Sequence, residues 1–426
     1  MNVSVRGAFV LIVLLLITTC VYSLYSGSVV INDSMEYLSL SSNLVEQNTL
    51  YAGELDQKLD YRLYSKRTIG YSLFLALQHQ NRFLILASQT LMVVLLFFIG
   101  LLLLRRLSNT RLGSLIYAVG FALNFTLFFH STFILSDLLL SVLVTMSVFT
   151  FYSINGSNKL NVLGFLWSLA LLVKPVLVPS VLLVTVVLTW QYTKTKKLPL
   201  SLLFPVLIFI GFSYTNLKNT GQFEYSSIST INLAQYNAKL TIAKKYGYDS
   251  AQQFANTIID KLPSTKAEYA NYKTSATELG KSAILENITT YLQVHVLGAI
   301  KMILDPGRFE LYTFFDETTS DISLTELIFA KNWSKLQSHL KTNPLLFYGF
   351  LFLFLVQLLK LLGFMMSFKV TFRDWFTVVL FVYFIGITGP VGAARFFLPL
   401  STLLVVYSAI GWEKGLHSFQ KSPKSK

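Results

Sequence analysis

Two acidic side chains, Asp33 and Glu36, follow the first long apolar segment of the sequence at a spacing of three residues. If a helix begins here, both carboxylates share one of its faces. A carboxylate held in this way can accept a proton from a hydroxyl group, so the pair predicts general-base chemistry, with Asp33 as the base and Glu36 in support. Tyr37 follows directly. The alternative is structural: Asp33 would be the N-cap and Glu36 the third helical residue of a capping box.

A third carboxylate, Asp137, stands at the start of another apolar segment. Ser141 and Thr145 follow it at intervals of four, so the three residues form a polar stripe on one helix face. A charge at the centre of a bilayer costs about 2.5–3.5 kcal/mol on insertion scales, and such residues normally face a cavity and a partner. We therefore count Asp137 as a catalytic candidate. The alternative is that Asp137 is an N-cap.

Two cations stand at ends of apolar segments that the charge distribution places outside the cytoplasm, where the positive-inside rule disfavours them. Lys174 precedes Pro175, and Arg395 lies in the segment 389–399. Guanidinium and ammonium groups bind phosphate through charge-assisted hydrogen bonds, so both residues are predicted to clamp a phosphate. The alternative is that their charged ends reach back to lipid headgroups.

Other polar residues are weaker candidates. Tyr71 and His130 lie near these motifs, and His295 lies among apolar residues, where a packed histidine is the simpler interpretation. The sequence has no closely spaced histidine pair, no cysteine pair, no HExxH and no glycine-rich phosphate loop. It therefore indicates no particular cofactor, and it does not decide whether a divalent metal takes part.

The composition indicates which kind of structural element positions these residues. Of 426 residues, 53% are hydrophobic and 13% charged, against about 25% charged in soluble proteins. Apolar runs long enough to cross a bilayer recur along the chain. We predict an all-α polytopic membrane protein with an uncleaved first span. The ten predicted spans are 8–24, 83–104, 112–130, 134–152, 160–173, 176–191, 198–216, 343–362, 375–390 and 395–412.

Positive charges gather in alternate connections. The net charge is +14, but basic residues at membrane boundaries orient helices, so this charge does not indicate a nucleic-acid partner. The positive-inside rule places both termini in the cytoplasm of a plasma (inner) membrane protein and the site residues outside. The cations on the inner side are Arg6, Arg105, Arg106, Arg111, Lys159, Lys194, Lys196, Lys197, Lys360, Lys369, Arg373, Lys414, Lys421, Lys424 and Lys426.

The connections on the outer side carry nearly all the acidic residues. We expect three parts: a transmembrane module, 1–216, with a first outer loop at 25–82; a mostly helical outer domain, 217–342; and a C-terminal transmembrane part with a basic tail, 343–426. Within the outer domain, helices are predicted over 250–262 and 265–302, between Pro263 and Pro306.

The order of these motifs resembles a known family. The acidic motif of Asp33, Glu36 and Tyr37 is followed by the segments Gly70–Leu77, Leu135–Asp137, Leu169–Pro175 and Arg395–Pro399. Together they resemble the GT-C membrane glycosyltransferases of the protein mannosyltransferase and aminoarabinose transferase type. The sequence departs from that pattern in its lone Asp33, where many members have paired acids, and in its smaller number of spans.

The resemblance implies a polyprenyl-phosphate sugar donor, an active site on the outer face and inversion at the anomeric carbon. It implies that Asp33 is the catalytic base, that Asp137 matches an acidic residue of the fourth span, and that Lys174 and Arg395 contact the donor phosphate. The acceptor would be a glycan, a lipid or a protein of the cell envelope. Two alternatives stay open, a polysaccharide polymerase or ligase and a membrane transporter.

Overall fold

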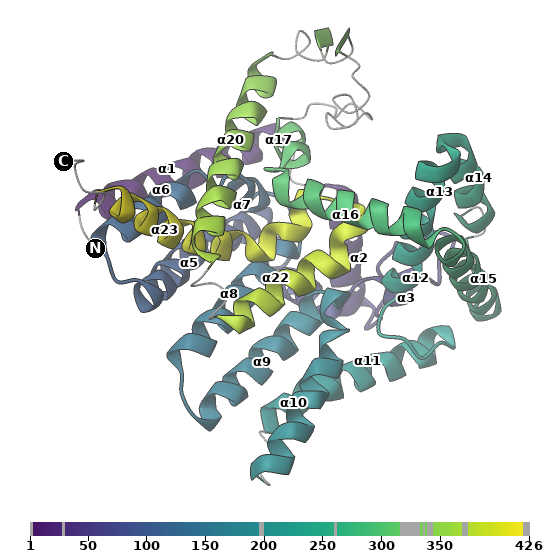
Figure 1. Cartoon of the computed structure of the whole chain (residues 1–426). Coiled ribbons are helices and arrows are strands. Elements are labelled where there is room, and N and C mark those ends of the chain that lie inside the picture. Colours follow the sequence, from purple (N-terminus) through teal and green to yellow (C-terminus); the bar gives the residue numbers. More distant parts are fainter. Residues whose placement is uncertain are drawn as a thin grey trace.

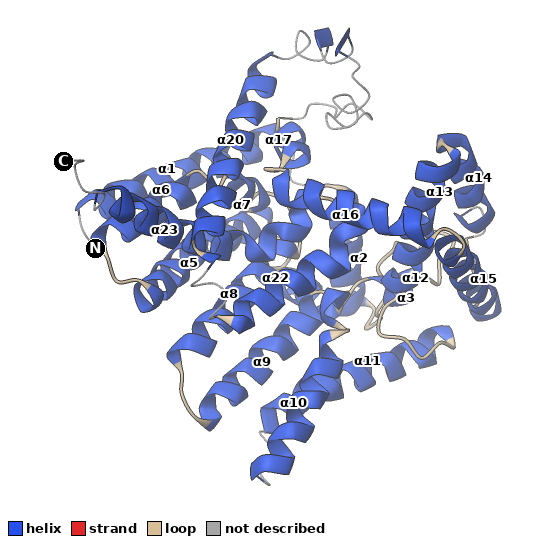
Figure 2. Cartoon of the chain, viewed as in Figure 1, coloured by secondary structure: helices blue, strands red, loops and turns tan. Residues whose placement is uncertain are grey.

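The protein is built from helices. The computed structural model describes residues 3–27, 30–195, 200–259, 262–315, 333–334, 337–338, 344–368 and 374–420, and these contain no strand (Figure 2). Of the predicted inner-side cations, Lys196, Lys197, Lys369, Arg373, Lys421, Lys424 and Lys426 lie outside the described residues.

Apolar helices form the main body, which confirms a polytopic helical membrane protein. Five are long and apolar enough to cross a bilayer: α1 (Val3–Ser26), α5 (Arg82–Leu107), α11 (Phe204–Thr220) with the preceding turn, α20 (Pro344–Met366), and α23 (Leu398–Gln420) with the preceding turn. Shorter apolar helices are α6 (Arg111–Ala122), α8 (Asp137–Ser153), α9 (Ser157–Val173), α16 (Ile288–Leu304) and α22 (Trp375–Thr388). α23 lies at the centre of this body, packed against α5, α6, α8 and α20 (Figure 1).

The predicted span 112–130 is wrong as a single helix. α6 ends at Ala122, and a separate short helix, α7 (Phe125–His130), begins after Asn124. Non-helical backbone at membrane depth is tolerated where it is buried in protein or lines a cavity. Asn124 is buried here, and its side chain contacts α20 through a hydrogen bond with Lys360.

The region around Lys174 forms two helices, as the prolines predict. α9 ends at Val173, a 3₁₀ turn covers Pro175–Leu177, and α10 (Ser180–Thr195) follows. The Ser201 hydroxyl donates a hydrogen bond to the Asn161 side chain near the other end of α9, at 2.9 Å. The chain after α10 has therefore returned to the end at which α9 began, so α9 and α10 run in opposite directions.

The connection between α11 and α20 is helical as far as it is described. It contains α12 (Ile228–Ile231), a π-helical turn (Asn232–Ala238), α13 (Lys239–Tyr246), α14 (Tyr248–Ile259), α15 (Lys266–Leu285), α16 and α17 (Arg308–Phe314). The predicted helix over 265–302 breaks at Glu286 and Asn287, between α15 and α16. α13, α14 and α15 form a lobe at one side of the molecule (Figure 1), and α16 leads from it back across α20 and α22.

Lys360 was predicted among the cations of the inner membrane boundary, and its position relative to a membrane stays a prediction. Its side chain is buried between α20 and the break at Asn124. The charge count placed it by its position in the sequence, whereas the direction of a helical side chain depends on which face of the helix it occupies.

Candidate active site

Seven charged side chains from five parts of the chain meet at one end of the helical body. We call them the charged cluster: Asp33, Glu36, Lys66, Arg67, Asp137, Lys174 and Arg395. Asp33 and Glu36 lie in the first and second turns of α2 (Asn32–Glu46). Arg67 joins them, because its Nη2 donates to Asp33 Oδ1 at 2.7 Å and its Nε donates to Glu36 Oε2 at 2.6 Å. The two carboxylates therefore share one helix face, as their spacing predicts.

Asp33 does not cap its helix. The N-cap is Ile31, and its backbone N–H donates to the Ser34 hydroxyl at 3.0 Å. The second carboxylate oxygen of Asp33 instead accepts from Arg395 Nη1 at 2.8 Å. Burial alone would raise the pKa of Asp33, but Arg67 and Arg395 outweigh burial and lower it to about 2. Asp33 is thus ionised at neutral pH.

Asp137 is not an N-cap either. It is the first residue of α8, its side chain is 3% exposed, and its carboxylate forms an ion pair with the ammonium of Lys174. The ring of Phe396 lies under both nearby cations, 5.3 Å from Lys174 Nζ and 5.1 Å from the guanidinium carbon of Arg395. Lys174 and Arg395 are therefore adjacent, and neither is free to reach lipid headgroups while these contacts hold.

Close packing brings the elements of the cluster together. A Cβ atom on Gly70, in α4 (Ile69–Ala76), would lie 2.7 Å from the backbone carbonyl of Leu172. Glycine thus allows α4 to contact the end of α9, so that Arg67 lies near Lys174. On the other side of the site, the Tyr37 hydroxyl is 2.8 Å from Ser136 Oγ, which ties α2 to the start of α8.

The remaining sequence candidates have different surroundings. Tyr37 faces Arg67, whose guanidinium carbon lies 5.0 Å from the ring centroid, so Tyr37 borders the cluster. Tyr71 is buried and donates to Gln89 Oε1 at 2.8 Å, which is a packing contact. His130 is buried, with its Nε2 3.3 Å from Glu310 Oε1 in α17. His295 packs beside Gly389 and contributes no contact to the charged cluster.

Sequence reasoning missed Lys66 and Arg67. Lys66, at the end of the short helix α3 (Leu63–Lys66), bonds Glu36 Oε1 at 2.7 Å. Both cations stand in the predicted first outer loop, where the positive-inside rule disfavours them. The argument that singled out Lys174 and Arg395 therefore applies to Lys66 and Arg67 as well. Glu310 was also missed, since nothing in the sequence relates it to His130, 180 positions away.

The cluster carries more positive than negative charge. Four cations face three carboxylates, so one positive charge is not compensated within it. Asp33 (25% exposed) and Arg395 (27% exposed) are the most accessible members of each sign. The described residues include no group of three or more His, Cys, Asp or Glu side chains that could hold a metal ion. The arrangement can bind an additional anion and presents an ionised carboxylate beside it.

Comparisons with known proteins do not identify a family for this chain. No protein-family model matches the sequence, and no curated protein matches it. Among solved structures, the crystal structure of ArnT from Cupriavidus metallidurans bound to undecaprenyl phosphate is similar over 98% of this chain and 81% of its own, with a TM-score of 0.41 and 11% sequence identity. A likeness at this level carries no argument about function.

Proposed function

We propose that the protein is a membrane glycosyltransferase that moves a sugar from a polyprenyl-phosphate donor to a hydroxyl group of a glycan, lipid or protein outside the cytoplasm. The observation that carries this proposal is the pair formed by Asp33 and Arg395. It joins an ionised carboxylate to a phosphate-binding group at the most accessible point of a charged cluster. The apolar helices around the cluster suit a donor that arrives from the bilayer.

The donor phosphate is bound by cations in this mechanism. Arg395 and Lys174 contact it, and the uncompensated positive charge of the cluster favours its binding. As the bond between the anomeric carbon and the phosphate oxygen breaks, the electron pair stays on that oxygen. The same two cations stabilise the negative charge that develops there.

Asp33 takes the proton of the acceptor hydroxyl as the new bond to the anomeric carbon forms. A general base of this kind contributes about 10²–10⁴-fold. A carboxylate with a pKa of about 2 is a weak base. If Arg395 turns to the phosphate, Asp33 loses one of the three cations that hold its pKa down, which are Arg67, Arg395 and Lys174. Donor binding therefore strengthens the base.

Inversion places a steric demand on this pair. The attacking hydroxyl and the leaving phosphate must lie on opposite faces of the sugar, so the sugar must fit between Asp33 and the phosphate. Arg395 Nη1 and Asp33 Oδ2 are only 2.8 Å apart. Their contact must open when the donor binds, and the two remaining bonds from Arg67 then keep Asp33 and Glu36 in place.

The direct test is a transfer assay in proteoliposomes that contain the purified full chain. Polyprenyl-phosphate sugars, each labelled in the sugar, are supplied with a membrane extract as the source of acceptor. We expect label to move to acceptor and polyprenyl phosphate to be released, and sugar nucleotides to give no transfer. If the sugar nucleotides are used and the lipid-linked sugars are not, the proposal is wrong.

A further inference from the structure

One exposed side of α16 carries a row of apolar side chains. The row repeats at intervals of four residues, and each member is between 46% and 56% exposed: Ile288, Leu292, Val296 and Ile300. Residues at this spacing lie on one face of a helix. Apolar residues that are exposed singly are normal on a protein surface, but a contiguous row of them indicates contact with another apolar surface.

The next side of α16 is also exposed but is mainly polar. It carries Thr289, Gln293 and Lys301, with Leu297 as the apolar residue among them. A helix that crosses the bilayer at its lipid boundary would expose apolar side chains only, and a helix in water would not expose the apolar row. An apolar side next to a polar side is the pattern of a helix that lies in the surface of a membrane.

The third side of α16 packs against protein near the charged cluster. Met302 is buried on this side. Gly298 lies against the turn Gly389–Val391 at the end of α22, where a Cβ atom on Gly298 would clash with the carbonyl oxygen of Gly389. α16 also contacts the following turn, Ala394–Phe397, which carries Arg395.

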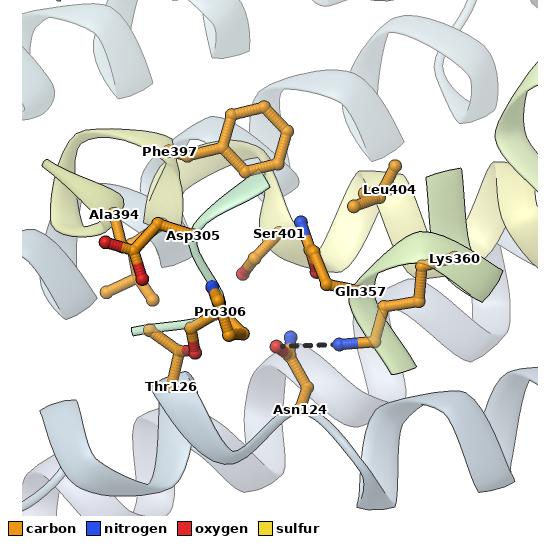
Figure 3. A pocket seen from close by; sticks show the side chains of 11 residues that line it. Asn124, Thr126, Asp305, Pro306, Gln357, Lys360, Ala394, Phe397, Ser401 and Leu404 are labelled. Carbon is orange, nitrogen blue, oxygen red and sulfur yellow. Dashed lines mark hydrogen bonds between the residues drawn. The ribbon is translucent and has the colours of Figure 1, made fainter. Parts of the chain in front are cut away.

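The end of α16 is held as well. Gln357 Nε2 in α20 donates to Ile303 O, in the last turn of α16, at 2.7 Å. Asp305 and Pro306, directly after the helix, line a pocket together with Gln357 (Figure 3). α16 therefore cannot turn about its axis without losing these contacts, so the apolar row is exposed because of how the helix is anchored.

We propose that α16 lies in the surface of the bilayer, with the apolar row immersed about 5–10 Å into the boundary between headgroups and acyl chains. Its polar side, with Gln293, faces water. α20 and α22, which α16 contacts, are apolar helices that expose side chains such as Leu355 and Val382, so the bilayer surrounds the elements that anchor α16. Because α16 contacts the turn of Arg395, this position places the charged cluster close to the headgroups. The inference does not depend on the proposed transfer reaction.

The test measures which solvent meets each side of α16. The full-length protein, with its one cysteine removed as Cys20→Ser, is labelled with a small fluorophore at Leu292→Cys or Val296→Cys and reconstituted into phosphatidylcholine vesicles. Brominated phosphatidylcholine quenches labels from the acyl chains, and iodide on both sides of the membrane quenches them from water. We expect brominated lipid to quench both labels by about twofold or more over iodide.

Three control positions calibrate the measurement. Gln293→Cys is the neighbour of Leu292 and lies about 100° around the helix, so its label should be quenched mainly by iodide. Tyr248→Cys, at a 72% exposed residue of α14 in the lobe, should behave in the same way. Val382→Cys, at a 66% exposed residue of α22, should be quenched mainly by brominated lipid.

The labelled side chains are exposed, and Ile288→Cys and Ile300→Cys repeat the measurement if a variant at the other two positions of the row folds poorly. Three results would overturn the inference. Quenching of the row by iodide alone would mean that it faces water. Quenching by neither agent would mean that protein covers it, either another segment of this chain or a second copy. Quenching of the Gln293 label by lipid would mean that the bilayer surrounds every exposed side of α16.

Discussion

The two accessible members of the charged cluster contribute different chemistry. Asp33 is held by two arginines from opposite ends of the sequence, at positions 67 and 395. Arg395 has further N–H groups besides the one that bonds Asp33, so it can hold the carboxylate and a phosphate oxygen in turn. An ammonium group is a point charge and does not offer this fork of donors.

Arg395→Lys should therefore keep the charge but lose the geometry. We expect transfer to fall by about 10²-fold or more, which is the usual effect of losing one donor to a developing negative charge. The thermal midpoint should change little. Truncation of Lys174 would be less informative. It would leave the buried Asp137 without its partner, at a cost of about 3–5 kcal/mol of stability.

The matched control is Arg62→Lys, which alters an arginine that is paired with Asp60 outside the cluster. It should retain most of the transfer activity. Wild-type turnover in Arg395→Lys would show that Arg395 contributes only a positive charge.

At the scale of elements, contacts between backbones determine where the charges meet. α4 lies against α9 where Gly70, three residues after Arg67, meets the backbone of Leu172, two residues before Lys174. The sequence showed Gly70 only as part of a motif, because no local pattern reveals that another backbone comes so close. Asn124 is similar: a single polar residue in an apolar run does not predict a helix break.

Gly70→Ala tests the importance of this contact. Its methyl group would lie 2.7 Å from the carbonyl of Leu172, so α4 must move away from α9. We expect the thermal midpoint to fall by several degrees and transfer to fall by at least tenfold. Gly211→Ala is the control, because a Cβ there meets no atom within 4 Å. Equal effects of both substitutions on activity and midpoint would contradict the role given to Gly70.

For the whole molecule, hydropathy and charge were enough to predict the helical membrane class and the position of most apolar helices. They also singled out Asp33, Glu36, Asp137, Lys174 and Arg395, whose side chains the structure brings together; their catalytic roles stay proposals. Hydropathy could not show which face of α20 holds Lys360, because side-chain direction depends on tertiary packing. It also could not pair His130 with Glu310, since that contact joins distant parts of the sequence.

The orientation in the membrane is a prediction at this scale. The charge distribution places the connection between α11 and α20 outside the cytoplasm. A reporter inserted near Asn271, in α15, should be active only as an extracytoplasmic enzyme such as a phosphatase. The same reporter near Lys159, in the first turn of α9, should be inactive. The opposite pattern would place the charged cluster on the cytoplasmic side and contradict the proposed acceptor.

The central claim is that the carboxylate of Asp33 accepts a proton. Asn fits the same space and keeps hydrogen-bonding capacity, but an amide cannot serve as a base. Because Asp33 caps no helix, Asp33→Asn does not remove a cap. The decisive measurement is the rate of sugar transfer at saturating donor, compared between wild type, Asp33→Asn and Glu36→Gln, with donor binding measured in parallel. We predict that Asp33→Asn binds donor and transfers at least 10²-fold more slowly, and that Glu36→Gln is affected less. Near-normal transfer by Asp33→Asn would contradict the account.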